Sequence, residues 1–170
     1  GPRPAKVVFP PAIVPRPERQ PPPDDDPFAL RHFEDDSDFL VFPIELGGNA
    51  GPGDADRALA LSQLLVHAIN VDPERFPQGL ALDAAGQPQP LSAYAASDTR
   101  YFVGGRLVRV AKSKSEAPFE LSLWIMDRAT SKVATRTVRP DLPLLMAPRN
   151  ALADLMADVD RPPTELMRAD

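Results

Sequence analysis

The sequence predicts an α/β fold: one domain built on a mixed sheet with two to three packed helices, preceded by a proline-rich arm. Ten of the 22 prolines fall within residues 1–27, whereas the rest of the chain has the apolar content of a globular domain. Apolar residues then recur at helical spacing in two segments, and strand-like segments lie before and between them. Strands interspersed with helices are typical of a mixed sheet covered by helices.

Residues 1–27 are expected to form an extended arm, because proline lacks a backbone N–H and is excluded from helix interiors and central strands. Polyproline II or coil remains. A flexible tether is the simpler interpretation; the alternative is an arm that docks, through two apolar patches, on the domain itself or on a partner. The patches are Val7, Val8 and Phe9, and then Ile13 and Val14.

Three segments are expected after the arm. They are an acidic linker over residues 28–37, the α/β domain over residues 38–163 and a tail over residues 164–170. Gly1 and Pro2 resemble the remnant of a cleaved tag, so we expect the natural start of the protein, with any membrane anchor, to precede residue 3.

The first predicted strand spans residues 38–46. Period-two spacing puts four apolar residues on one face, and the other face is partly apolar too, so the strand is expected to be covered on both sides. Pro43 cannot donate to a ladder, which predicts that pairing ends near it or that the strand lies at an edge. The first face carries Leu40, Phe42, Ile44 and Leu46, and the second carries Phe39 and Val41.

The first predicted helix runs from Asp54, its expected cap, to about Asn70. His67 lies off its apolar stripe and is expected to be a surface residue rather than a ligand or base. The stripe consists of Ala58, Leu61, Leu65, Ala68 and Ile69. After this helix the apolar residues follow no clear period. We expect a short strand around 79–83, then a turn at Gly86 and a short helix through 92–96.

Residues 100–139 predict a three-stranded antiparallel meander, with strands at 100–111, 119–127 and 132–139. Gly104 and Gly105 inside the first strand predict a bulge or a close backbone approach. The second strand alternates cleanly, which is typical of a half-buried strand. One face carries Phe119, Leu121, Leu123 and Ile125, and the other carries Glu120, Ser122, Trp124 and Met126. A last helix is expected to start near Pro148 and to carry Leu152, Leu155, Met156 and Val159 on its buried face.

Composition excludes several classes of function. A net charge of -5 and a pI near 5.0 argue against nucleic acid as a partner. With Cys 0 and His 2, the chain has no disulfide, no thiolate zinc site and no site built on several imidazoles. We therefore expect no metal and no cofactor. No motif pairs a nucleophile with a base, so catalysis is not expected. No window reaches the 18 or so apolar residues of a membrane-spanning helix.

Residues 100–170 carry 12 Lys and Arg against 9 Asp and Glu, and five of these cations are candidates for binding a partner, together with the two patches of the arm. The simpler alternative is that they keep sheet edges soluble. Alternation sends Arg106 and Arg109 to opposite faces of their strand. The candidates are Arg106, Arg109, Lys112, Lys114 and Arg136.

Two stretches are familiar. VFPIELGGN followed by DADRALALSQLLVHAI, and RYFVGGRLVRV followed by FELSLWIMDRATSKV, resemble the TolB amino-terminal domain superfamily over about residues 38–160. Relatives of that kind include curli secretion lipoproteins, lipoprotein activators of penicillin-binding proteins and exopolysaccharide export lipoproteins. Their hairpin turn is typically Asp-x-x-Thr-Gly, and this chain has Ser131 at the glycine position.

The resemblance implies a bacterial, non-catalytic module, periplasmic or associated with the outer membrane, that works through protein contacts. It would serve as an accessory or scaffold subunit of an envelope assembly, secretion or export machine, often among identical copies, with the membrane reached through an anchor outside this sequence. The alternative is a cytoplasmic sensory or regulatory domain that binds a small ligand within a larger signalling protein.

Overall fold

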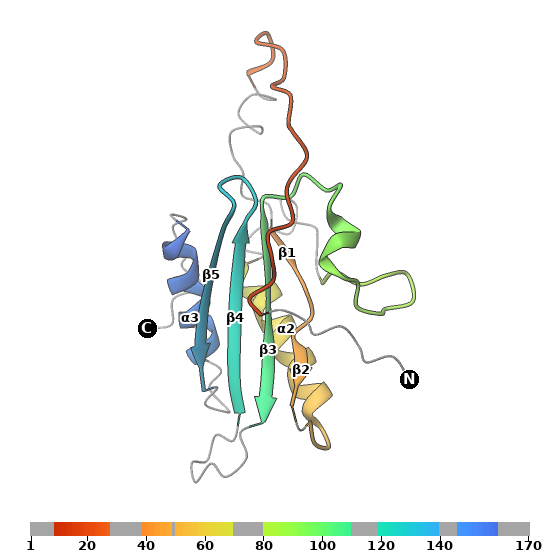
Figure 1. Cartoon of the computed structure of the whole chain (residues 1–170), viewed down its shortest axis with the longest axis vertical. Coiled ribbons are helices and arrows are strands. Elements are labelled where there is room, and N and C mark those ends of the chain that lie inside the picture. The colour runs from red at the N-terminus through yellow and green to blue at the C-terminus, as the bar shows by residue number, and fades with distance from the viewer. Residues whose placement is uncertain are drawn as a thin grey trace.

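The structure is a computed structural model that describes residues 9–27, 39–48, 50–69, 80–109, 119–139 and 146–159. Figure 1 shows a sheet with two helices on one face and the arm on the other. In chain order the elements are β1 (Phe39–Val41), β2 (Glu45–Gly47), α2 (Asp54–Ile69), the 3₁₀ helix η1 (Leu91–Tyr94), β3 (Tyr101–Arg109), β4 (Phe119–Asp127), β5 (Lys132–Val138) and α3 (Met146–Asp158).

The five strands form one mixed sheet in the order β1-β3-β4-β5. β2 also pairs with β3, on the same edge as β1 and further along the strand. β1 and β2 run parallel to β3, whereas β3, β4 and β5 are antiparallel neighbours. This confirms the predicted α/β class, the mixed sheet and the meander in the carboxyl half. The weak strand expected around 79–83 consists, in its described part, of isolated bridges at Leu80 and Leu82.

The first predicted strand is divided in two at Pro43. Val41 is opposite Val103 and Glu45 is opposite Arg106, so three residues on this side face two on β3. This extra residue is a bulge, and it turns Ile44 to the opposite face. The prediction that Ile44 shares a face with Leu40 and Phe42 is therefore wrong: Ile44 packs in the core with Phe39 and Val41. Ile44 N–H donates to Ser62 Oγ of α2 at 2.9 Å.

The main core lies between the sheet and the two helices. It contains the predicted stripes of both helices and the predicted inner face of β4, from Phe119 to Ile125. α3 begins at Met146, two residues before the expected Pro148, because the apolar pattern marks the buried face rather than the first turn. The helix residues in this core are Ala58, Leu61, Leu65, Ala68, Ile69, Ala151, Leu152, Ala153, Leu155 and Met156, and Val159 directly after α3 joins them.

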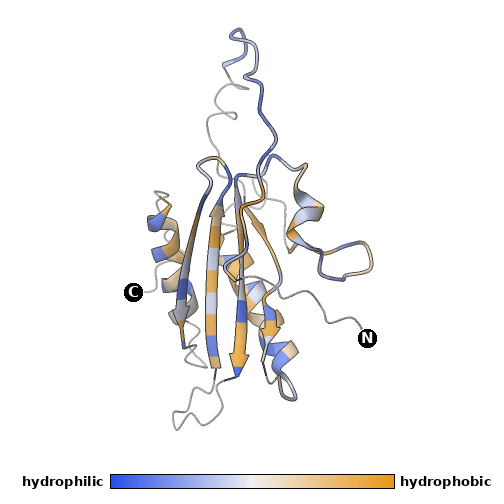
Figure 2. Cartoon of the chain, in the orientation of Figure 1, coloured by the Kyte–Doolittle hydropathy of each residue, from blue (hydrophilic) through white to orange (hydrophobic). Residues whose placement is uncertain are grey.

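A second core covers the opposite face of the sheet. The prediction that β4 is half-buried is wrong at its carboxyl end, where Trp124 is 5% exposed and Met126 is fully buried. The arm contributes to this burial, because it runs along this face of the sheet in Figure 1 and three of its residues pack on the second core. Figure 2 shows apolar and more polar residues alternating along β4. This core consists of Leu40, Phe42, Ala81, Phe102, Trp124 and Met126, covered by Phe9, Ile13, Val14, Leu91, Tyr94 and Val133.

The glycine pair of β3 allows a close approach, as predicted. A Cβ atom on Gly104 would lie 2.5 Å from Cζ2 of Trp124, the residue opposite it on β4. One on Gly105 would lie 2.7 Å from the carbonyl oxygen of Ser122. The bulge suggested as the alternative is absent from the pairing of β3 with β4, which is continuous from Tyr101 to Arg109. Ser131 adopts φ 58°, so it occupies a left-handed position that favours glycine.

Candidate functional site

Arg128 holds the arm against the sheet. It follows β4, its residue is 3% exposed, and its guanidinium lies over the Phe102 ring with 4.4 Å from Cζ to the ring centroid. A guanidinium has five N–H donors, and here all five meet main-chain carbonyl oxygens. Nε donates to Val14 at 2.8 Å, Nη2 to Pro15 at 2.8 Å and Ala95 at 2.9 Å, and Nη1 to Ser97 at 2.7 Å and Thr99 at 3.0 Å.

We call these five acceptors the carbonyl cage. Burial lowers the pKa of Arg128, the charge of Arg16 lowers it further, and Asp98 opposes both. Arginine nevertheless remains a cation at neutral pH, so the cage binds a buried positive charge through carbonyl dipoles. Two of the five dipoles belong to the arm, and the charge is therefore fully bonded when the arm is in place.

Further contacts fix the arm along what we call the arm-binding face, formed by Phe42, Phe102, Trp124, Met126 and Arg128. Val14 N–H points to Sδ of Met126 at 3.5 Å, and the Phe9 ring lies beneath Arg106 at 5.3 Å. Arg19 lies 4.0 Å from Asp98. The structure thus shows the docked alternative for residues 9–19, on the domain's own surface. Val7 and Val8 lie outside the described residues, and binding of a separate partner by the arm stays a prediction.

Asp127 precedes Arg128 and is 1% exposed. Arg100 donates two hydrogen bonds to its carboxylate, at 2.9 and 3.0 Å. Burial raises the pKa of Asp127, but the hydrogen bonds and charge of Arg100, with smaller help from Thr130 and the Ala129 N–H, leave the pKa below its ordinary value. This carboxylate is accordingly an ionised structural group that fixes the turn carrying Arg128.

The structure describes three of the predicted basic residues, and they do not share one face of the sheet. Arg106 lies on the arm side of the sheet, 3.7 Å from Glu45, whereas Arg109 contacts Asp54 of α2 at 2.9 Å. Arg136 contacts Asp158 of α3 at 3.1 Å. Each of these three cations thus has an acidic partner in its own chain, and the opposite faces expected for Arg106 and Arg109 are confirmed. Lys112 and Lys114 lie outside the described residues.

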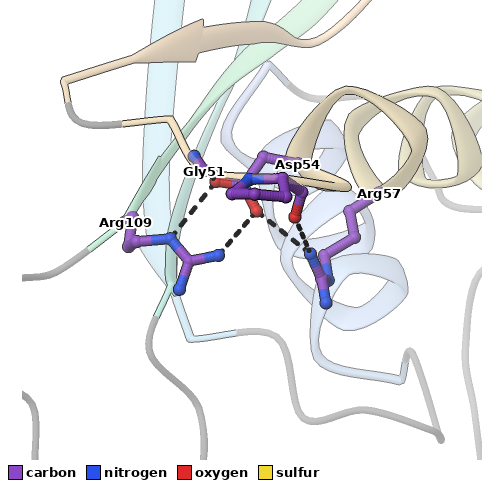
Figure 3. A network of polar contacts seen from close by, with 5 residues as sticks. Gly51, Asp54, Arg57 and Arg109 are labelled. Atoms are coloured by element: carbon purple, nitrogen blue, oxygen red, sulfur yellow. Dashed lines mark hydrogen bonds and ion pairs between the residues drawn. The ribbon is translucent and has the colours of Figure 1, made fainter.

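Asp54 joins the start of α2 to the end of β3 (Figure 3). Its carboxylate is 2% exposed and accepts hydrogen bonds from Gly51 N–H at 2.6 Å, Arg57 at 3.1 Å and Arg109 at 2.9 Å. The prediction that Asp54 is the cap needs correction, because the Gly53 carbonyl already accepts from Arg57 N–H and Asp54 is the first helical residue. Its carboxylate bonds the preceding loop and two arginines instead.

This network predicts acid-sensitive stability. The hydrogen bond from Arg109, the Gly51 N–H and the two nearby cations hold the pKa of Asp54 below its ordinary value, against the opposing effect of burial. A carboxyl whose pKa is lower in the folded state stabilises the fold above the unfolded pKa of about 4, and this contribution is lost as pH falls through the folded pKa. Asp54→Asn should therefore lower the thermal unfolding midpoint at neutral pH and flatten its decline in acid.

The measurement is the unfolding midpoint of both proteins between about pH 7 and about pH 2.5, which brackets the carboxyl titration. Asp154→Asn, on the exposed side of α3, is the matched control and should follow the unmodified protein. An Asp54→Asn profile that declines as steeply in acid as the unmodified one would show that this carboxylate contributes nothing specific.

A second surface lies beside β2. A groove of about 850 Å³ runs along this strand and the first turns of α2, and reaches Pro88 and Arg106. We call it the edge groove. Two large apolar side chains are exposed in it, Leu46 at 39% and Leu59 at 48%. β2 pairs with β3 on one side, and on its other side the described residues provide no ladder partner. β1, in contrast, receives a hydrogen bond from Ala81.

Three further features concern a histidine, metal binding and membrane spanning in the part of the chain that the structure describes. His67 is exposed on α2, as predicted. Among the described side chains, no group of three or more His, Asp or Glu residues could hold a metal ion. None of the described helices combines the length and the apolar character needed to cross a membrane.

Comparisons with known proteins give a distant likeness in shape. No protein-family model matches the chain, and no curated protein matches it in sequence. Among solved structures, the chain is similar to the dodecamer of a PelC variant from Paraburkholderia phytofirmans, with a TM-score of 0.38 and 13% identity over 78% of this chain and 88% of that chain. A likeness this weak carries no argument about what this chain binds or how it assembles.

Proposed function

We propose that this chain is a non-catalytic protein-interaction module that binds an extended segment of a partner protein in the edge groove. The observation that carries the proposal is the juxtaposition of a strand edge without a ladder partner among the described residues and two exposed leucines, Leu46 and Leu59, in one open groove. Solvated strand edges and exposed apolar side chains are each common, but together they match the way in which extended peptides add to a sheet.

The groove specifies the chemistry of the segment. Main-chain groups of residues 45–47 would pair with it, and its apolar side chains would cover the leucines. β2 has three residues, so its ladder alone is short, and the apolar contacts must supply much of the affinity. Glu45, whose side chain is 54% exposed beside Arg106, would accept a basic side chain at the rim. The preferred ligand is therefore an extended, alternating apolar segment with a basic residue.

We further propose an accessory or scaffold role in a bacterial envelope assembly, secretion or export machine, in the periplasm or at the outer membrane. The support for this location is the sequence resemblance of residues 38–160 to the TolB amino-terminal domain superfamily. A membrane anchor, where one exists, would precede the proline-rich arm. Partners would be envelope proteins, including further copies of this chain.

Peptides selected from a displayed random library against the full chain test the groove. Leu59→Glu should weaken the selected peptides at least tenfold, which corresponds to about 1.4 kcal/mol, because it places a charge among the apolar contacts. Ala60→Glu is the matched control, since Ala60 is exposed on the same helix but does not line the groove, and should leave the dissociation constant unchanged. Fluorescence anisotropy measures both. Selected peptides that bind Leu59→Glu and the unmodified chain equally would contradict the proposal.

A further inference from the structure

The arm-binding face and the main core are separate structures. All members of the main core, and the apolar residues packed against it, lie at residue 39 or beyond, so the sheet and its two helices enclose that core without the arm. The arm covers the second core together with Leu91, Tyr94 and Val133 of the domain, and this core contains fully buried Phe102 and Met126 and nearly buried Trp124. If the arm left, the part of this core beneath it would become an exposed apolar patch, which folded proteins rarely leave uncovered.

This face is a built binding site for an extended segment. Val14 and Pro15 contribute main-chain carbonyls to the cage, and Phe9, Ile13 and Val14 are half-buried against aromatic and aliphatic side chains. Proline-rich segments suit such a site, because they are already extended and lose little conformational entropy when they bind on aromatic surfaces. The ligand class is therefore a proline-rich extended segment with a pair of branched aliphatic residues before a proline.

The chain between the docked arm and the sheet is long. Residues 20–38, between Arg19 and Phe39, number 19. At about 3.3 Å for each residue they span up to about 60 Å, whereas a domain of about 120 residues has a radius of gyration of about 14 Å. Figure 1 shows the arm leaving the arm-binding face and continuing beyond the end of the sheet. This length permits the arm to reach the same face of a neighbouring molecule.

We propose that the arm-binding face is an exchangeable binding site, and that residues 9–19 of a second copy of this chain occupy it in trans. The second copy then supplies two of the five carbonyls around Arg128, so the site of one molecule is completed by the other. Contacts in cis and in trans are identical, so local concentration decides between them. For a connection of this length, the effective concentration in cis is of the order of mM. Exchange is favoured where copies are held together at comparable density, as in an assembly or on a membrane.

Cross-linking between single-cysteine variants tests the exchange, and the chain contains no cysteine of its own. Arg19 and Asp98 are neighbours across the arm and the domain. Chains with Arg19→Cys are mixed with chains carrying Asp98→Cys at about 1 mM, which matches the effective concentration in cis, and treated with a short bismaleimide. Arg19→Cys mixed with Thr135→Cys, an exposed position on β5, is the control. The readout is the yield of the covalent heterodimer.

The expected result is a heterodimer yield at least fivefold above the control, which an excess of a synthetic peptide of residues 8–20 reduces to the control level. A single chain with both Arg19→Cys and Asp98→Cys should become cross-linked internally when dilute. Mixed variants that give no more heterodimer than the control, while the double variant is linked internally, would overturn the proposal. A double variant that fails to link internally would overturn it too. The edge groove is unaltered in these variants, so this outcome is independent of the proposed function.

Discussion

Arg128→Leu should lower the free energy of unfolding by about 3 to 5 kcal/mol, because it removes a cation around which buried carbonyls are arranged. The five acceptors come from the arm and from the segment after η1, and leucine can donate to none of them. Loss of the cage also releases the arm from the second core. Urea denaturation followed by circular dichroism measures the change.

Arg128→Lys gives a graded comparison. Lysine keeps the charge but has three donors without the planar fork, so it should lose part of the cage and fall between the unmodified protein and the leucine variant. Arg139→Leu is the surface control, since its side chain is 53% exposed and lies 3.7 Å from Glu120, and it should cost less than about 1 kcal/mol. An Arg128→Leu protein as stable as Arg139→Leu would refute a structural role for the cage.

Gly104→Ala should lower the free energy of unfolding by about 2 to 3 kcal/mol, because the new methyl group must displace a well-packed indole. The Cβ would meet Cζ2 and Cε2 of Trp124 at 2.5 and 2.9 Å, below any normal contact distance. Trp124 is the single tryptophan of the chain, so its fluorescence reports directly on the change. Emission should shift to longer wavelength as the ring becomes more exposed.

The rescue variant is Gly104→Ala combined with Trp124→Phe, since phenylalanine lacks the fused ring to which the clashing atoms belong. The two changes should be non-additive, and the double variant should be less destabilised than the sum of the singles. Additive losses, or an unchanged emission spectrum in Gly104→Ala, would show that the indole does not require glycine at this position.

The strands and helices were predictable where burial follows a local period. The stripe of α2, the buried face of α3 and the alternation of β4 are repeated over several turns or residues, and each was found in the main core. Pro43 predicted an interruption in the first strand but not its geometry. Whether the extra residue forms a bulge, and thereby turns Ile44 toward α2, depends on the pairing with β3, which is distant in the sequence.

The candidate sites were less predictable. Arg128 lies in a segment whose composition predicts a turn, and nothing around it in sequence indicates burial. Its acceptors lie up to 114 positions away, so no local pattern connects them. Arg106, Arg109 and Arg136, three of the basic residues predicted as a surface, have acidic partners in β2, α2 and α3 that become neighbours once the sheet has formed.

By itself the sequence determined the α/β class, the meander, the faces of both helices and the concentration of prolines at one end of the chain, because each depends on spacing or on backbone chemistry within a few residues. The tertiary structure decided where the arm lies, which face of the sheet it buries, how Arg128 is satisfied and which strand edge is left beside an open groove. These features depend on contacts between segments far apart in the chain, and such contacts leave no periodic signal in any one of them.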